Sequence, residues 1–412
     1  MDKKRHLEQK VNQLLGMFPL VAILGARQCG KSTFVQGLRP HWKYYDLESP
    51  DHYQLISSDP VAFFAVNDGD LIIDEAQQYP EIFRVLRGVI DRDRKRKGRF
   101  ILTGSSSPDI VSGITESLAG RIATIEMSPF KQSEFYERLS SPLYRLIAEE
   151  GAAMSDFASL QPQISLEHSM HLWLKGGFPE PLIESESNDL YYSQWMENYI
   201  SSYVERDIRT LFPRLNLHSF KRFLTLLAQF SGHQLNMSSM ARSLEVSVPT
   251  IKEYLEIIHQ TFLWRNLSAY EKNTLKKVQK SKKGLFRDQG VLHHLLRIKS
   301  LDSLLLHPVA GVSFESFVIE ELIRGLHTTM ATRLAFSYYR TIDKSEVDLI
   351  MEGDFGTIPV EIKLNSIIKP KALLGLKNFI SDTGAHYGIV VNRGMRIEQL
   401  GEQIIQIPVH YL

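Results

Sequence analysis

The chain of 412 residues is longer than one ordinary domain, so we expect two or three domains. Apolar residues make up 43% and charged residues 23%, the shares of a soluble globular protein. The single cysteine, Cys29, excludes an intramolecular disulfide and a zinc ribbon. Because the net charge is only +1, any attraction to nucleic acid must come from local patches.

The N-terminus superficially resembles a secretory signal, since Lys3, Lys4 and Arg5 precede an apolar stretch at 18–24. That stretch continues directly into a glycine-bearing loop, so its removal would destroy the loop. No apolar run approaches the length of a membrane span. We therefore expect a cytoplasmic protein without a membrane partner.

The loop at 25–32 has the spacing G-x4-G-K-S and stands between an apolar run and the start of a helical pattern. This is a Walker A motif in its expected context, and the alternative is a glycine-bearing loop without a ligand. Backbone N–H groups and the Lys31 ammonium suit phosphate oxygens, while the Ser32 hydroxyl suits Mg²⁺. The sequence predicts an ATP and Mg²⁺ site formed by Gly25, Ala26, Arg27, Gln28, Cys29, Gly30, Lys31, Ser32 and Thr33.

A short apolar strand at 71–74 ends in the carboxylates Asp74 and Glu75. Buried parallel strands deliver such acids to the C-terminal edge of a sheet. Asp74 is expected to hold Mg²⁺ through water, and Glu75 to polarise the attacking water. An isolated motif of this kind is weak evidence, but its pairing with the Walker A loop is strong.

Further strands are expected at 44–47, 99–103 and 123–127, alternating with helices, which is typical of a parallel sheet. Thr103 and Ser105 then lie beside the acids, where they would sense the γ-phosphate and help to place the water; alternatively, they cap the next helix. Arg121 precedes the last strand, where AAA+ ATPases carry an arginine finger for a neighbouring subunit. This predicts a homo-oligomer, unless Arg121 merely closes its helix at the surface.

From about 130 to 300 the pattern is mostly helical, with a break at Gly176-Gly177-Phe178-Pro179. Residues 236–263 are typical of a helix-turn-helix, and 263–269 with 273–278 could form the two strands of a wing. Six lysines without an intervening acid could neutralise the phosphates of DNA, and a solvated hairpin is an equal alternative. These lysines are Lys272, Lys276, Lys277, Lys280, Lys282 and Lys283.

The C-terminal pattern is a helix at 314–327, strands at 334–340, 346–351 and 357–363, a helix at 370–381 and a strand at 387–392. Glu361 and Lys363 share one face of their strand because side chains alternate, and Asp348 lies on the other arm of the hairpin. This arrangement is similar to the PD-(D/E)xK nuclease-like core, in which two acids bind Mg²⁺ and the lysine orients or activates a water. Glu315 matches an additional acid of that core, and a cross-strand ion pair is the alternative.

The whole chain resembles bacterial and archaeal ATP-binding proteins that combine an AAA+ domain of the AAA_14 kind with a C-terminal DUF4143 region. The resemblance rests on residues 25–32, 73–77, 102–106, 118–121, 176–179, 203–208, 314–318, 346–348 and 360–363. In related signalling ATPases a Gly-x-Pro turn places its proline against adenine, which implies such a contact for Pro179; a helix-breaking turn is the alternative. Asp288-Gln289-Gly290 departs from the family pattern Asp-Thr-Gly, which leaves the role of Asp288 open.

Together these patterns predict an α/β protein in three parts. They are a P-loop AAA+ parallel-sheet domain at 1–135, a helical lid and winged-helix region at 136–304, and a nuclease-like DUF4143 domain at 305–412. The expected function is Mg²⁺-dependent ATP hydrolysis that couples nucleotide state to the later regions, acting on DNA. The alternatives are a nucleotide-gated switch or scaffold, and a nucleic-acid-binding regulator, both without nuclease activity.

Overall fold

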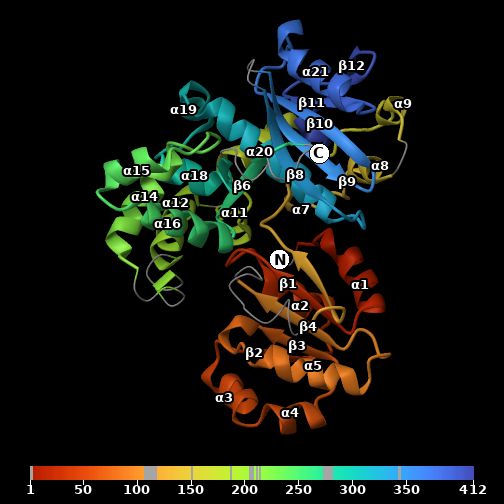
Figure 1. Cartoon of the computed structure of the whole chain (residues 1–412), viewed down its shortest axis with the longest axis vertical. Coiled ribbons are helices and arrows are strands. Elements are labelled where there is room, and N and C mark those ends of the chain that lie inside the picture. Colours follow the sequence, from red (N-terminus) through yellow and green to blue (C-terminus); the bar gives the residue numbers. More distant parts are fainter. Residues whose placement is uncertain are drawn as a thin grey trace. The chain divides into compact units, whose positions relative to one another are not determined.

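The computed structural model describes residues 3–105, 118–149, 152–185, 188–203, 208–209, 212, 215–271, 282–341 and 345–412. They form two compact units, shown in Figure 1: Met1–Phe130 with Gln260–Phe262, and Lys131–His259 with Leu263–Leu412. In the described parts of the chain, no helix has both the length and the apolar character needed to cross a membrane.

The first unit is built on a parallel five-stranded sheet with the order β2-β3-β4-β1-β5. Its strands are β1 (Leu20–Leu24), β2 (Lys43–Asp46), β3 (Leu71–Asp74), β4 (Phe100–Gly104) and β5 (Ile122–Glu126). β1, β3 and β4 are buried along their whole length, which explains why they are almost continuous apolar runs. The predicted parallel sheet and α/β class are confirmed, and the strand limits agree within one residue.

Helices accompany this sheet: α1 (Leu7–Met17), α2 (Lys31–Leu38), α3 (Pro50–Ser58), α4 (Pro60–Val66) and α5 (Ile82–Arg92). Two of them begin with a proline at the first turn, and Asp59 also accepts the N–H of Ala62 at 2.9 Å, which fixes the start of α4. α5 buries Phe83, Leu86 and Ile90 in the same core as the strands. This packing holds the polar ends of the strands in place.

The second unit contains a mixed eight-stranded sheet with the order β12-β13-β11-β10-β9-β8-β6-β7. Its strands are β6 (Trp264–Ala269), β7 (Lys283–Phe286), β8 (Ala335–Arg340), β9 (Glu346–Gly353), β10 (Gly356–Lys363), β11 (Gly388–Asn392), β12 (Glu398–Gly401) and β13 (Ile404–Pro408). The helices α20 (Ala310–His327) and α21 (Leu374–Thr383), with the 3-10 turn η3 (Pro370–Leu373), belong to the same region. β12 and β13 were not among the predicted elements.

The sheet extends across the predicted limit at 304/305. β6 pairs in parallel with β8 through Ser268 opposite Ser337, and antiparallel with β7. The first strand predicted for a wing, at 263–269, is therefore part of the C-terminal sheet, where it pairs with β7. The second unit also begins at Lys131, five residues before the predicted limit at 135/136.

The rest of the second unit is helical, and α12, α14, α15, α16 and α18 lie together in Figure 1. The helices are α7 (Gln132–Phe135), α8 (Pro142–Ala148), α9 (Met154–Phe157), α10 (Leu166–Lys175), α11 (Pro179–Glu184), α12 (Asp189–Ser202), α14 (Leu217–Ala228), α15 (Met237–Leu244), α16 (Val248–Gln260), α18 (Gln289–Leu295) and α19 (Leu301–Leu306). α15 and α16 occupy the predicted helix-turn-helix segment. The expected strand at 273–278 and four of the lysines, Lys272, Lys276, Lys277 and Lys280, fall outside the described residues.

Candidate functional site

The Walker A loop joins the end of β1 to the start of α2 and requires glycine at two positions. A Cβ on Gly25 would lie 1.9 Å from the carbonyl oxygen of Met127, so any side chain would displace backbone. Gly30 has a φ of 92°, a left-handed conformation that glycine adopts without strain. As the N-cap of α2, Gly30 has no side chain that could accept the N–H groups of the first turn. The N–H groups of Lys31, Ser32 and Thr33 therefore lie at a helix N-terminus, where proteins bind anions.

Lys31 lies over this loop and is almost fully buried. Its ammonium group donates to the carbonyl oxygens of Gly25 at 3.1 Å and Ala26 at 3.0 Å, and to the hydroxyl of Ser105 at 3.0 Å. The Ser105 hydroxyl in turn donates to a carboxylate oxygen of Glu75 at 2.6 Å. A continuous chain of hydrogen bonds therefore joins the Walker A lysine to the Walker B glutamate.

The two acids at the end of β3 are held by neighbouring strands. Asp74, which is 2% exposed, accepts hydrogen bonds from the hydroxyls of Tyr44 and Thr103. The Glu75 N–H donates to Thr103 at 3.1 Å, and the Gln77 amide donates to the Glu75 carboxylate. The Thr103 hydroxyl is thus engaged with the acids themselves and acts as a positioning group for them.

Two of these partners, Tyr44 and Gln77, were missed by the sequence reasoning. Tyr44 lies on β2, whose last residue Asp46 is in register with Asp74, so Tyr44 reaches Asp74 diagonally across the sheet. Burial and the neighbouring carboxylate of Asp74 raise the pKa of the Tyr44 hydroxyl. The sequence did contain a signal for this contact, because Tyr44 lies two residues before the end of β2, the strand next to β3.

The other loop residues contribute to its shape. The thiol of Cys29 is buried and faces the carbonyl oxygen of Met127 at 3.4 Å, so it points into the protein beside β5. Arg27 forms an ion pair with Glu48 at 3.0 Å, and Gln28 has a φ of 60°. The donor set fits a nucleotide and a hard cation: Lys31 and the N–H groups for phosphate, Ser32 and Asp74 for Mg²⁺.

Arg121 lies at the N-terminal ends of the strands of this sheet, whereas the Walker A loop lies at their C-terminal ends. Arg121 precedes β5, whose first residue Ile122 pairs with Leu20 at the start of β1, whereas the Walker A loop follows the end of β1. Its guanidinium binds Asp91 through two hydrogen bonds of 2.7 and 2.9 Å. Arg121 therefore cannot serve the site of its own chain, and its predicted role toward a neighbouring subunit stays a prediction.

Pro179 lies in the second unit, where it begins α11. The preceding glycines are held by Asp288, which accepts the N–H of Gly177 at 2.7 Å and also caps α18. A Cβ on Gly176 would lie 2.1 Å from the Asp288 carboxylate, and burial raises the pKa of that carboxyl group. These contacts give the break and Asp288 a structural role, and the adenine contact of Pro179 stays a prediction.

The four C-terminal candidates come together in the second unit. Lys363 forms ion pairs with Glu361 and, at 3.4 Å, with Asp348, whose carboxylate also accepts the N–H of Ile362 at 2.8 Å. Glu315, on α20, pairs with Lys283 from β7. Lys283 is 5% exposed, so it belongs to this acid cluster, which corrects its assignment to an exposed basic patch.

Burial and mutual repulsion disfavour ionisation in this cluster. Burial first, and then the charge of Asp348, raise the pKa values of both Glu315 and Glu361, while Lys283 and Lys363 respectively oppose the shift. One carboxylate oxygen of Glu361, Oε2, is buried without a hydrogen-bond partner among the described residues. In the same part of the chain, no three His, Cys, Asp or Glu residues are arranged to hold a metal ion. The carboxylates predicted to bind a metal ion therefore lie close together, but they form ion pairs with lysines.

The first unit, with its parallel sheet, phosphate loop and paired acids, defines a P-loop ATPase fold of the AAA type. Family models match an AAA domain at 17–136, a domain of unknown function (DUF8612) at 166–302 and another (DUF4143) at 310–412. The chain therefore carries the predicted combination of an AAA domain with DUF4143.

Two uncharacterized proteins are similar to this chain over nearly its whole length. The uncharacterized proteins Rv2008c of Mycobacterium tuberculosis and Mb2031c of Mycobacterium bovis are each 29% identical over 409 residues, covering 98% of this chain and 83% of theirs. The Walker-type ATPase PABY2304 of Pyrococcus abyssi aligns with 17% identity over 72% of this chain and 96% of its own, at a TM-score of 0.46. ORC1 of Aeropyrum pernix, solved with DNA, aligns with 12% identity over 72% and 93%, at a TM-score of 0.28.

Proposed function

We propose that the chain binds ATP with Mg²⁺ and hydrolyses it at the loop between β1 and α2. The observation that carries this proposal is the chain of hydrogen bonds from Lys31 through Ser105 to Glu75. The Ser105 hydroxyl accepts from the Lys31 ammonium, which would bind the phosphates, and donates to the Glu75 carboxylate, which would orient the water. Such an arrangement can report the presence of the γ-phosphate to the group that orients the nucleophile.

Each residue has a distinct task in this proposal. Lys31 and the first-turn N–H groups of α2 bind phosphate oxygens, and the bound Mg²⁺ supplies charge neutralisation beside Ser32 and Asp74. Glu75 orients the water, with Gln77 and Ser105 fixing its carboxylate. Thr103 holds both acids in position.

Two substitutions test the proposal. Lys31→Ala should abolish ATP binding, whereas Glu75→Gln should keep binding within a few-fold and lower hydrolysis by about 10²- to 10⁴-fold. Lys43→Ala and Glu81→Gln, at exposed positions of the same unit, are the matched controls. Binding is measured by calorimetry and turnover by phosphate release; hydrolysis by Glu75→Gln at the parental rate would show that its assigned role is wrong.

A second candidate function is metal-dependent phosphodiester cleavage by the acid cluster of Glu315, Asp348, Glu361 and Lys363. The Glu361 Oε2, which is buried and has no hydrogen-bond partner among the residues that the structure describes, favours it, because such an oxygen is a ready ligand for a cation. A divalent ion would also relieve the repulsion that raises the pKa values of both glutamates. The ion would have to displace the ammonium group of Lys363 from the carboxylates.

The full chain is the sample for this second test. Calorimetry should show Mn²⁺ or Mg²⁺ binding that Asp348→Asn abolishes, and a nicking assay should show activity that Lys363→Met abolishes. Asp302→Asn, elsewhere in the second unit, is the control. Binding without nicking would make the region a recognition domain, and the absence of both would return these residues to a structural ion-pair cluster.

Action on DNA forms the last part of the proposal. The observation that favours it is the α15–α16 pair followed by the β6–β7 hairpin, with the exposed Lys282 immediately before β7. Measuring duplex DNA binding with ATP, with ADP and without nucleotide distinguishes an ATP-controlled regulator from a switch or scaffold that binds no DNA. A salt-dependent affinity that changes with nucleotide would support the regulator.

A further inference from the structure

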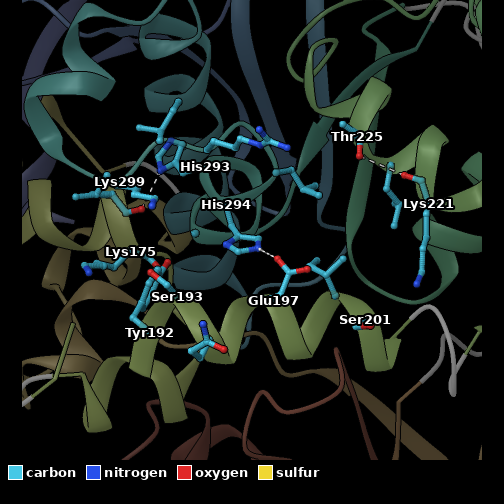
Figure 2. A pocket seen from close by; sticks show the side chains of 18 residues that line it. Lys175, Tyr192, Ser193, Glu197, Ser201, Lys221, Thr225, His293, His294 and Lys299 are labelled. Atoms are coloured by element: carbon cyan, nitrogen blue, oxygen red, sulfur yellow. Dashed lines mark hydrogen bonds and ion pairs between the residues drawn. The ribbon is translucent and has the colours of Figure 1, made fainter. Parts of the chain in front are cut away.

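The helical part of the second unit contains a pocket of about 580 Å³ (Figure 2). Its walls come from α10, α12, α14 and α18 and from the turn that follows α18. All lining residues fall between Leu174 and Lys299, so the pocket lies within the segment that matches DUF8612. It is therefore separate in sequence from both the Walker motifs and the C-terminal acid cluster.

The charge of the lining is strongly positive. Lys175, Lys221, Arg297 and Lys299 line the pocket, whereas Glu197 is the one acid among the described residues that do so. Figure 2 shows Glu197 of α12 facing His294 of α18, and the two form a contact of 3.1 Å. Because this acid already has a partner, the excess positive charge of the lining favours an anion.

The pocket also offers a surface for a flat apolar group. Leu174, Ile200, Leu224 and Ile298 contribute aliphatic side chains, and the ring of Tyr192 lies 4.2 Å from the ammonium group of Lys175. The Tyr192 hydroxyl donates to the carbonyl oxygen of Lys175 at 2.6 Å, which fixes the ring in the wall. A rigid aromatic ring beside cations is the combination that recognises a base joined to phosphate.

Arg297 lines the pocket from a backbone position that glycine adopts with less strain. It has a φ of 60° at the end of α18, where its N–H donates to His294 at 3.0 Å and the N–H of Ile298 donates to His293 at 2.9 Å. This is the C-terminal helix motif in which glycine is the least strained residue. The chain thus has an arginine at a position where glycine would have less backbone strain, and this arginine lines the pocket.

From these observations we propose that the pocket is a second ligand site, which binds a phosphorylated small molecule of nucleotide size. Its volume is in the range of sites for small molecules and cofactors. Arg297 and Lys299, from the turn that follows α18, bind the phosphate, and Tyr192 with the aliphatic wall contacts the base. The segment that matches DUF8612 then contains a ligand site that shares no residue with the Walker A loop.

The test uses the full chain carrying Lys31→Ala, so that the Walker A loop no longer contributes. Calorimetry is performed with inorganic pyrophosphate, with the 5′-monophosphates of adenosine, guanosine, cytidine and uridine, and with oligo(dT). At least one monophosphate should bind with one-to-one stoichiometry, and adding Arg297→Gly should weaken it by about tenfold, the loss expected for one strong charge-assisted contact. Lys299→Gln should also weaken binding of the monophosphate, and it serves as a second variant because Arg297→Gly also changes the turn.

The matched control is Arg333→Gly, because Arg333 has a φ of 55° and lies outside this pocket. Both glycine variants should raise or keep the unfolding temperature, and only Arg297→Gly should lose affinity. Three results would overturn the proposal: no binding of any probe at 1 mM, equal affinity of the Arg297→Gly and Arg333→Gly chains, or binding of oligo(dT) alone. The last result would assign the pocket to nucleic acid.

Discussion

The two ends of the chain both place lysine near carboxylates, but they balance its charge in different ways. In the first unit, the three hydrogen bonds that Lys31 makes within the described residues go to neutral oxygens, two carbonyls and a hydroxyl. In the second unit, Lys363 and Lys283 contact carboxylates directly. The first arrangement leaves positive charge for a ligand, whereas in the second the charge of each lysine is already balanced by a carboxylate.

This difference separates two sites made of the same residue types. A buried ammonium held by neutral groups is stabilised further when an anion arrives, so the Walker A loop is prepared for phosphate. A cluster of three carboxylates and two ammonium groups gains less from a divalent cation, because the ion must first displace a lysine. The readiness of a site therefore depends on which partners its charges already have.

The largest expected effect separates these two lysines. At a pH above the raised pKa of Glu315, Lys283→Met should destabilise the second unit by about 3–5 kcal/mol, because it leaves the ionised Glu315 buried beside Asp348 without its cation. Lys31→Met should cost the first unit only about 1 kcal/mol, since its partners are neutral. Calorimetric unfolding of both variants measures the contrast, with the exposed Lys282→Met as control. Equal losses would show that the charge of Lys283 is not needed by the cluster.

The next effect concerns pH, again within the second unit. Burial lowers the pKa of His293 to about 4, while its ring nitrogens contact the carbonyl oxygen of Leu174 and the hydroxyl of Ser313. Because the unfolded chain protonates this ring first, stability should fall as the pH drops from about 6.5 to 4, by about 3 kcal/mol at most. His293→Gln should flatten this slope in urea titrations of the second unit. An unchanged slope would exclude His293 as its source.

The acid cluster should act with the opposite sign. Glu315 and Glu361 have raised pKa values in the folded chain, so their ionised forms destabilise it at high pH, and this loss is relieved as the pH falls through their folded pKa values. Glu361→Gln should therefore reduce the gain in stability on acidification from alkaline pH, whereas His293→Gln leaves it in place. The two variants distinguish the two contributions in one titration series.

The sequence predicted the first unit better than the second for a physical reason. Parallel strands buried on both faces, such as β1 and β3, are short apolar runs that local composition reveals. β12 is four residues long and partly exposed, so it has no distinctive pattern, whereas β13 is a buried and largely apolar strand that the sequence reasoning overlooked. Local periodicity gives little warning of a strand such as β12.

Long-range pairing explains what was missed in the sites. Lys283 reaches Glu315 because β7 joins the C-terminal sheet through β6, and no spacing in the chain indicates that connection. The convergence of Asp348, Glu361 and Lys363 was predictable because one hairpin brings them together. Tyr44 reaches Asp74 only through the order of the strands, which the sequence leaves open.

A smaller effect tests the positioning role of Thr103. Thr103→Val keeps the shape but removes the hydroxyl shared by Asp74 and the Glu75 N–H, so the first unit should lose about 1–3 kcal/mol. ATP affinity should change little while hydrolysis slows, because the phosphate contacts stay and the acids shift. The exposed Thr124→Val on β5 is the control. A loss of affinity with normal turnover would instead make Thr103 a ligand contact.

The smallest effect on stability is expected at Arg121. Its ion pair with Asp91 is solvent-accessible and screened, so Arg121→Ala should leave the unfolding temperature of the first unit unchanged within error, unlike Lys283→Met in the second unit. The same variant should nevertheless lose ATPase activity if the guanidinium leaves Asp91 to enter a neighbour's site. Mixing inactive Arg121→Ala with inactive Lys31→Ala should then restore part of the activity, because a mixed assembly contains sites with both groups intact. Co-assembly is verified by pull-down of differently tagged chains; no recovery in verified mixed assemblies would leave Arg121 with only its surface ion pair.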